Sequence, residues 1–154
     1  MQPLHIDKIG HGPDLVLLHG WGMHGGIWDG VREALAQQFR LHMVDLPGYG
    51  ASAHRDPYTL AELARDVAQA MPQAAHVCGW SLGGQVALRL ALDFPARVSR
   101  LVLIGTTPCF RQRADWPHGM DDATLEECAR SLETDYAGTR KRFLSLQARS
   151  GDDA

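Results

Sequence analysis

The chain has 154 residues, of which 45% are hydrophobic and 21% are charged, and its formal net charge is -3 at pH 7. This length and composition predict a globular protein with a sizeable core, and the negative charge argues against a general nucleic-acid-binding function. No apolar run approaches the roughly 20 residues that span a bilayer, and no signal peptide is visible at the N-terminus. Three widely spaced cysteines indicate reduced thiols, so we expect a cytoplasmic protein without disulfides.

Short apolar runs alternate with helical patterns through the first hundred residues. The strands are expected at residues 4–9, 15–18, 41–44, 77–80 and 101–104, and the helices at residues 27–39, 59–71 and 82–94. Continuous apolar runs are typical of strands buried on both faces of a parallel sheet, and the looser 4–9 pattern indicates an edge strand. The alternation predicts right-handed crossovers. The sequence therefore predicts an α/β fold in which helices flank a parallel sheet.

The first of these helices rests on four apolar residues that recur every four positions. They are Ile27, Val31, Leu35 and Phe39, and they predict an amphipathic helix. After Pro108 the pattern changes: residues 110–119 are irregular, and two further helices are expected at 124–132 and 135–148. An apolar stripe is expected in this last part, formed by Leu132, Tyr136, Phe143, Leu146 and Gln147.

A serine framed by glycines joins the 77–80 run to the 82–94 helix, in the order Gly79-Trp80-Ser81-Leu82-Gly83. The Gly-x-Ser-x-Gly pattern is typical of the nucleophile elbow, a sharp strand-to-helix turn that holds a serine oxygen at its tip. Side chains at the two glycine positions would collide across so tight a turn. The pattern therefore predicts Ser81 as a catalytic nucleophile.

Acyl transfer also needs hydrogen-bond donors for the oxyanion that develops on the substrate. In such elbows one donor is the backbone N–H of the residue after the nucleophile, here Leu82. The second comes from the loop after an early strand, so Trp21 in His19-Gly20-Trp21-Gly22 is the candidate. His19 is expected to shape this loop by hydrogen bonding rather than to act as a base. The other histidines lack metal-ligand spacing, so no metal and no cofactor are expected.

Through three motifs the chain resembles the α/β-hydrolase superfamily. They are His19-Gly-Trp-Gly22, Asp45-Leu-Pro-Gly-Tyr-Gly-Ala-Ser52 and Gly79-Trp-Ser-Leu-Gly-Gly84. Their combination is similar to the family of pimeloyl-[acyl-carrier protein] methyl ester esterases of biotin synthesis. Further matches to that family are Trp80 and the segments 107–110, 116–117 and 142–147. The similarity extends over nearly the whole chain, from about residue 15 to residue 147.

The resemblance implies a serine carboxylesterase that cleaves the methyl ester of an acyl chain carried on acyl carrier protein. It implies an α/β-hydrolase core over residues 1–108 and the beginning of a helical lid over residues 109–154. By similarity, the substrate would contact Trp21, Ser81, Leu82, Phe143, Leu144, Ser145, Leu146 and Gln147. The acidic carrier protein would meet the basic residues Arg140, Lys141, Arg142 and Arg149. The full-length form is expected to be a monomer that binds neither nucleic acid nor membrane.

Simpler interpretations stay open for the apolar residues near the end of the chain and for the basic residues expected to meet the carrier. An apolar stripe at helical spacing is often core packing, and a basic cluster is often a solvated face.

In these hydrolases the acid and the histidine of the triad follow the serine along the chain. The histidine that follows Ser81 is His118, with Asp115, Asp121 and Asp122 near it. It matches no catalytic position of the resembling family, which places its acid and histidine after two further strands. We therefore expect the chain to be the N-terminal part of a hydrolase. Its sheet is expected to end in an unpaired apolar strand at 101–104, and its hydrolysis of activated esters to be feeble or absent.

Two other functions stay open. Another α/β-hydrolase, such as a short-chain esterase or a C–C hydrolase, would share the elbow. A non-catalytic module that binds an acyl chain or its carrier would keep the pocket without the base. Turnover of the carrier-bound ester against generic esters separates the two enzymes, whereas binding of the carrier with no change in the ester favours the module.

Overall fold

The computed structural model describes residues 3–148, with side chains described as far as Ser145. The chain divides into two compact units, Met1–Pro108 and Cys109–Ala154, and each is described here by itself. No helix in the described part is long and apolar enough to cross a membrane.

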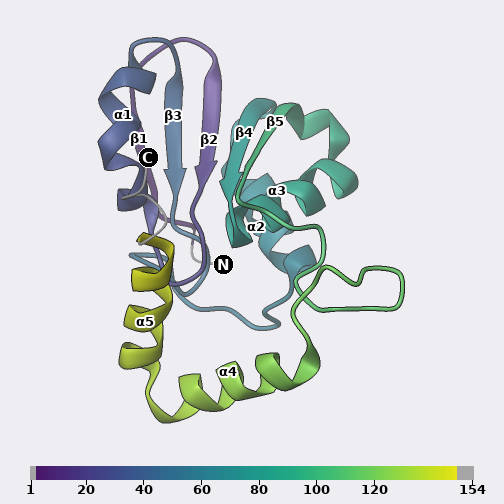
Figure 1. Cartoon of the computed structure of the whole chain (residues 1–154). Coiled ribbons are helices and arrows are strands. Elements are labelled where there is room, and N and C mark those ends of the chain that lie inside the picture. The colour runs from purple at the N-terminus through teal and green to yellow at the C-terminus, as the bar shows by residue number, and fades with distance from the viewer. Residues whose placement is uncertain (1–2, 149–154) are drawn as a thin grey trace. The chain divides into compact units, whose positions relative to one another are not determined.

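The first unit is built on a five-stranded sheet in the order β1-β3-β2-β4-β5 (Figure 1). The strands are β1 (Ile6–Ile9), β2 (Asp14–Leu18), β3 (Arg40–Val44), β4 (Ala75–Trp80) and β5 (Val98–Ile104). β1 pairs antiparallel with β3, and the remaining pairs are parallel. The α/β fold and the edge position of the first strand are therefore confirmed.

Two helices, α2 (Leu60–Ala70) and α3 (Leu82–Asp93), cover what we call the first face of the sheet (Figure 1). Buried residues of the strands, such as Val16 and Val77, meet Val86 and Leu90 of α3 in the larger of two core clusters. α2 begins where the Thr59 hydroxyl accepts a hydrogen bond from the Glu62 amide at 3.2 Å. α3 ends at Asp93, before the short 3₁₀ helix η2 (Pro95–Arg97), because proline cannot continue a helix.

The second face of the sheet is covered by the 3₁₀ helix η1 (Gly25–Trp28) and by α1 (Asp29–Ala36), which lies on the opposite side from α2 and α3 (Figure 1). Trp28 and Ala36 pack there against strand residues such as Leu17 and Met43.

The predicted helix at 27–39 is wrong in its bounds and in its apolar face. The α-helix spans only Asp29–Ala36, and the side chains of Ile27 and Val31 are exposed. Ile27 lies in η1 and Phe39 lies beyond the end of α1, and residues spaced by four also drift about 40° per step around a helix, so the four apolar residues do not form one face of a single helix. The structure buries Trp28 and Ala36 instead.

β5 forms the second edge of the sheet, and the residues at its C-terminal end are apolar and exposed. Val102 is 50% exposed and Ile104 is 43% exposed. Within the described residues β5 pairs with β4 alone. The expectation of an unpaired apolar edge strand is therefore confirmed.

The second unit contains the helices α4 (Asp122–Thr134) and α5 (Tyr136–Ala148). α4 begins at Asp121, whose carboxylate accepts a hydrogen bond from the Thr124 amide at 2.9 Å. The irregular segment before α4 is closed by two isolated bridges, Arg111 to Met120 and Arg113 to Trp116. Two helices after an irregular segment were predicted, and both are present.

The apolar stripe predicted from Leu132 to Gln147 does not lie on one helix. Leu132 belongs to α4, which ends at Thr134, and the non-helical Asp135 separates it from α5. The side chains of Leu146 and Gln147 lie outside the described residues, so their part of the stripe stays a prediction.

Candidate active site

Ser81 stands at the junction of β4 and α3, in a backbone conformation that is rare for a residue with a side chain. Its φ is 53° and its ψ is -115°, and within the described residues it is the one residue other than glycine with a positive φ. Such backbone strain costs of order 1–3 kcal/mol and persists where the surrounding structure enforces it. A strained serine at a strand-to-helix turn is the geometry of a nucleophile elbow.

Close backbone contacts across the turn explain the two glycines of the pattern. A Cβ atom added at Gly79 would lie 2.3 Å from the carbonyl oxygen of Gly83. A Cβ atom added at Gly83 would lie 2.3 Å from the carbonyl oxygen of Leu18, at the end of β2. Both distances are far below van der Waals contact, so only glycine permits this approach of α3 to β4 and β2.

The loop after β2 lies directly against the elbow. A Cβ atom added at Gly20 would lie 3.4 Å from the Cβ of Ser81 and 3.1 Å from the Trp80 ring. Trp21, the next residue, is half-buried. The structure thus brings together the loop and the serine that sequence patterns assign to one site.

The imidazole of His19 holds this loop in place. The ring is fully buried; its Nδ1 lies 2.8 Å from the Gly20 carbonyl oxygen, and its Nε2 accepts a hydrogen bond from the Leu46 amide at 3.0 Å. Burial lowers the pKa of His19, although the Gly20 carbonyl and the nearby Asp45 oppose that shift. His19 therefore stays neutral and joins the loop after β2 to the loop after β3, which agrees with the shaping role expected for it.

Asp45 ties the start of η1 to the loop after β3, a role that sequence reasoning did not give it. Its carboxylate accepts hydrogen bonds from the amides of Gly25 at 2.7 Å and Ala51 at 2.9 Å, and lies 3.1 Å from the His5 ring. Burial alone would raise the pKa of Asp45, but these amides, together with His5 and His19, hold it below its usual value. The position of Asp45 in the Asp45–Ser52 motif could have indicated a structural role. Its partner Gly25 could not be found from the motif, because it lies 20 residues away in the sequence.

Among the described residues, no histidine is hydrogen-bonded to the Ser81 side chain. The Ser81 side chain also makes no capping hydrogen bond to the turn that follows. His118, the histidine that follows it in sequence, is in the second unit, where its ring packs edge-on against Trp116. Among residues 3–148 no group of three or more His, Cys, Asp or Glu side chains could hold a metal ion.

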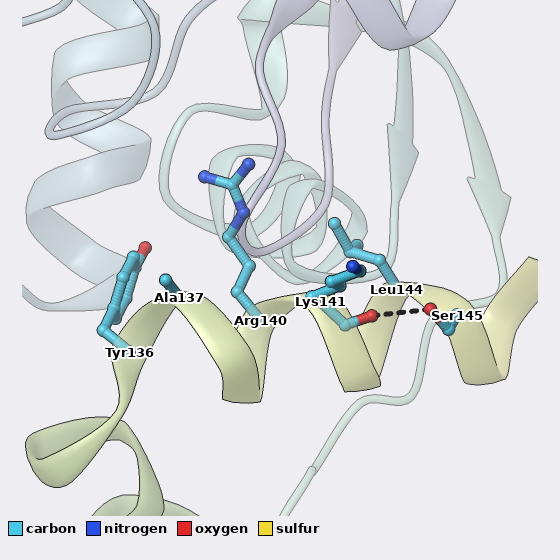
Figure 2. Close-up of a pocket in the computed structure, with 6 residues that line it drawn as sticks. All are labelled: Tyr136, Ala137, Arg140, Lys141, Leu144 and Ser145. Atoms are coloured by element: carbon cyan, nitrogen blue, oxygen red, sulfur yellow. Dashed lines mark hydrogen bonds between the residues drawn. The ribbon is translucent and has the colours of Figure 1, made fainter.

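The other predicted contact residues lie on α5 in the second unit. Figure 2 shows Tyr136, Ala137, Arg140, Lys141 and Leu144 projecting from one side of this helix, while the Ser145 hydroxyl donates to the Lys141 carbonyl oxygen at 2.8 Å. These residues line a hollow of about 600 Å³ on the α5 surface. Phe143 is half-buried.

The predicted basic residues differ in their charge partners. Arg142 donates to the Thr139 hydroxyl at 2.9 Å and lies 3.6 Å from the Asp135 carboxylate. Arg140 and Lys141 are exposed and have no carboxylate within 4.0 Å among the described side chains. Arg149 lies outside the described residues. Two cations that have no carboxylate partner among the described side chains therefore lie beside the apolar Leu144 on one face of α5 (Figure 2).

Comparison with known proteins places this geometry in a family. Residues 13–153 match the model of the alpha/beta hydrolase fold family. The chain belongs to the α/β-hydrolase fold family. Because that family uses the elbow, the loop after an early strand and a mostly parallel sheet together, the arrangement around Ser81 follows its plan.

Among curated relatives, the pimeloyl-[acyl-carrier protein] methyl ester esterase of Nitrosomonas europaea is 54% identical over 153 residues, which are 99% of this chain and 61% of that protein. The protein of the same name from Nitrosospira multiformis is 49% identical, over 98% of this chain and 60% of its own length. This α/β-hydrolase chain thus spans about three fifths of the length of these relatives.

Solved structures of esterases share its fold. The esterase EaEST from Exiguobacterium antarcticum superposes with a TM-score of 0.84 at 28% identity, over 91% of this chain and 55% of its own. A thermophilic esterase from Thermogutta terrifontis gives a TM-score of 0.70 at 26% identity, over 85% of this chain and 47% of its own. The similarity to esterases therefore extends from sequence to three-dimensional structure.

Proposed function

We propose that this α/β-hydrolase chain belongs to a serine carboxylesterase that hydrolyses the methyl ester of pimeloyl-[acyl-carrier protein], with Ser81 as its nucleophile. The observation that carries the proposal is the strained Ser81 at the strand-to-helix turn, with the His19–Gly22 loop against it. The choice of substrate rests on the relatives with that name, which are 54% and 49% identical. The three free cysteines suit a reducing compartment, and we place the protein in the cytoplasm.

The proposed chemistry begins with attack of Ser81 Oγ on the ester carbonyl carbon. The carbonyl oxygen gains negative charge and accepts hydrogen bonds from the backbone N–H groups of Leu82 and Trp21. Methanol leaves with the proton that Ser81 Oγ gave up. Water then cleaves the acyl-serine: one of its protons restores the Ser81 hydroxyl, the other passes to solvent, and the carrier-bound pimeloyl carboxylate is released. No metal or cofactor is needed for these steps.

In this proposal the second unit is the beginning of a lid that binds the acyl chain and its carrier. Phe143 and Leu144 are apolar enough to contact methylene groups, and Ser145, Leu146 and Gln147 follow them on α5. Arg140 and Lys141 support docking of an acidic carrier better than Arg142 does, because Arg142 is already near Asp135. Arg149 is kept as a docking residue from sequence alone, and the active form is proposed to be a monomer.

The test compares carrier-bound pimeloyl methyl ester with p-nitrophenyl butyrate as substrates of the purified chain. We expect slow release of methanol from the carrier-bound ester, lost in Ser81→Ala, because no described histidine is hydrogen-bonded to Ser81. Release at the same rate from Ser81→Ala would contradict the nucleophile.

A short-chain esterase is a second candidate, favoured by the TM-score of 0.84 with EaEST. Ser81-dependent turnover of p-nitrophenyl butyrate at ordinary esterase rates, with none of the carrier-bound ester, would support it instead. Tight binding of the carrier with no Ser81-dependent change in the ester would favour a non-catalytic binding module.

A further inference from the structure

The main chain of Ser81 is held by the segment that follows β5. The Ser81 amide donates a hydrogen bond to the Ile104 carbonyl oxygen at 2.9 Å. The Thr106 hydroxyl lies 3.3 Å from the Ser81 carbonyl oxygen and 3.1 Å from the Ile104 carbonyl oxygen, and shares its one proton between these two acceptors. Both ends of the Ser81 main chain are therefore tied to the end of β5.

Thr106 has little freedom to move away from this position. A Cβ atom added at Gly84 would lie 1.9 Å from Thr106 Oγ1 and 2.8 Å from its Cβ and Cγ2 atoms, so the side chain packs directly on the first turn of α3. The first turn of α3 also contacts Thr107, because Gln85 Nε2 donates a hydrogen bond to the Thr107 carbonyl oxygen at 3.0 Å.

The Ser81 carbonyl belongs to the same peptide unit as the Leu82 N–H. It also accepts hydrogen bonds from the amides of Gly84 at 3.0 Å and Gln85 at 3.1 Å, so three donors fix its direction. A peptide unit is planar and trans, and the direction of its carbonyl therefore sets the direction of its N–H. Hydrogen bonds to the carbonyl also polarise the unit and strengthen its N–H as a donor.

We propose that Thr106 is a positioning residue for the oxyanion hole: by holding the Ser81 carbonyl, its hydroxyl aims the Leu82 N–H at the developing oxyanion. The inference rests on the proposed role of Ser81 as nucleophile. It assigns a role in the reaction to a side chain that touches neither the substrate nor the reacting atoms.

The test measures phosphonylation of Ser81 by an alkyl fluorophosphonate, followed by intact mass. In this reaction the Ser81 Oγ–P bond forms, the P–F bond breaks, fluoride leaves and the serine proton passes to solvent. At alkaline pH, hydroxide can take that proton without a protein base. The phosphoryl oxygen occupies the oxyanion hole, so the maximal rate reports on the Leu82 N–H, and the reagent concentration at half-maximal rate reports on binding.

The decisive variants are Thr106→Val, which removes the hydroxyl at nearly constant shape, and Thr106→Ser, which keeps it. Losing a whole oxyanion donor costs a hundredfold or more, so we expect misdirecting one to lower the maximal rate about tenfold in Thr106→Val. The half-maximal concentration should stay unchanged, and Thr106→Ser should restore the rate. Thr134→Val, which removes a hydroxyl that donates to the Arg130 carbonyl oxygen on α4, is the matched control and should react like the wild type.

Folding of each variant is checked by circular dichroism, and Thr106→Ala replaces Thr106→Val should the latter fail to fold. An unchanged maximal rate in the variants without the hydroxyl would overturn the inference. So would an equal loss in Thr106→Ser, because packing rather than the hydroxyl would then be responsible. Labelling of the wild type that persists in Ser81→Ala would instead contradict the proposed nucleophile, and the inference would fall with it.

Discussion

The two faces of the sheet are covered to different extents. On the first face, α2 and α3 bury a large cluster that reaches from Leu4 to Leu90. On the second face, η1 and α1 bury a smaller cluster over β2 and β3 that includes Trp28 and Met43. The two faces use alternate residues of the same strands, so the difference lies both in those residues and in the helices that cover them.

The register between β4 and β5 shows where the cover of the second face ends. Cys78 pairs with Val102 in parallel register, so both side chains point to the same face. Cys78 is buried, whereas its neighbour Val102 is half exposed. Hydrophobic stabilisation scales with the apolar area removed from water, so we infer that the first face carries most of the stability.

The largest expected effect is on the first face. Leu90→Ala leaves a cavity under α3 and should lower the free energy of unfolding by about 2–5 kcal/mol. Leu92→Ala, on the same helix, should change it by less than about 0.5 kcal/mol, because Leu92 is 76% exposed whereas Leu90 is fully buried. Urea unfolding measures both. Similar losses in the two variants would contradict the place of Leu90 in the core of the first face.

Acidification should loosen the cover of the second face first. The folded protein lowers the pKa of His19 mainly by burial, and it lowers the pKa of Asp45 because amide hydrogen bonds outweigh the effect of burial. Both groups therefore bind fewer protons when folded than when unfolded. The His19 contribution is complete above the ordinary histidine pKa and is lost as the pH falls towards its folded value. The Asp45 contribution is lost at still lower pH, as the pH falls through its folded pKa.

Hydrogen exchange as a function of pH measures this effect. The Gly25 amide, which opens η1, donates to Asp45, so amides of η1 should lose protection at a higher pH than amides of α2 on the first face. Loss of protection at one common pH would show that the two covers open together, against this prediction.

A smaller effect is expected from the start of α2, which covers the first face. Thr59→Ala removes the hydroxyl that accepts a hydrogen bond from the Glu62 amide, and such a cap contributes about 1 kcal/mol. Thr59→Ser keeps the acceptor and should stay close to the wild type in thermal unfolding. An equal loss in both variants would point to the lost methyl group rather than to the cap.

The smallest effect on stability is expected at β5. Val102→Ala should change the free energy of unfolding by less than about 0.5 kcal/mol, because its side chain is already half exposed. Its effect on association is different: an exposed apolar edge strand favours pairing between molecules, and a charge there blocks it. Val102→Lys should therefore reduce self-association in sedimentation velocity, whereas Leu92→Lys on α3 should not.

Local patterns predicted the strands and the elbow because each depends on neighbouring residues. The glycine at 79 follows from packing against Gly83 across the turn, whereas the glycine at 83 also makes room for the Leu18 carbonyl oxygen and was identified because it belongs to the same short motif. The first helix was predicted wrongly, because four-residue spacing resembles a helical face but drifts around it. The contribution of small Ala36 to the core cannot be read from such a pattern.

The supports of the site could not be predicted in the same way. Asp45 reaches Gly25, and Thr106 reaches Ser81, across 20 and 25 residues of sequence. Such contacts depend on which strands become neighbours and on how their ends align. Sequence alone identified Ser81 as the candidate nucleophile, but the groups that hold its main chain required the fold.

The backbone of Ser81 also has a consequence for engineering. With φ at 53°, this position suits glycine better than any other residue, because glycine alone adopts such a conformation without a steric cost. A selection for thermostability that is blind to activity would therefore favour glycine at position 81 and remove the hydroxyl on which the proposed chemistry depends. The residue that the proposed chemistry needs most is one that stability alone would replace.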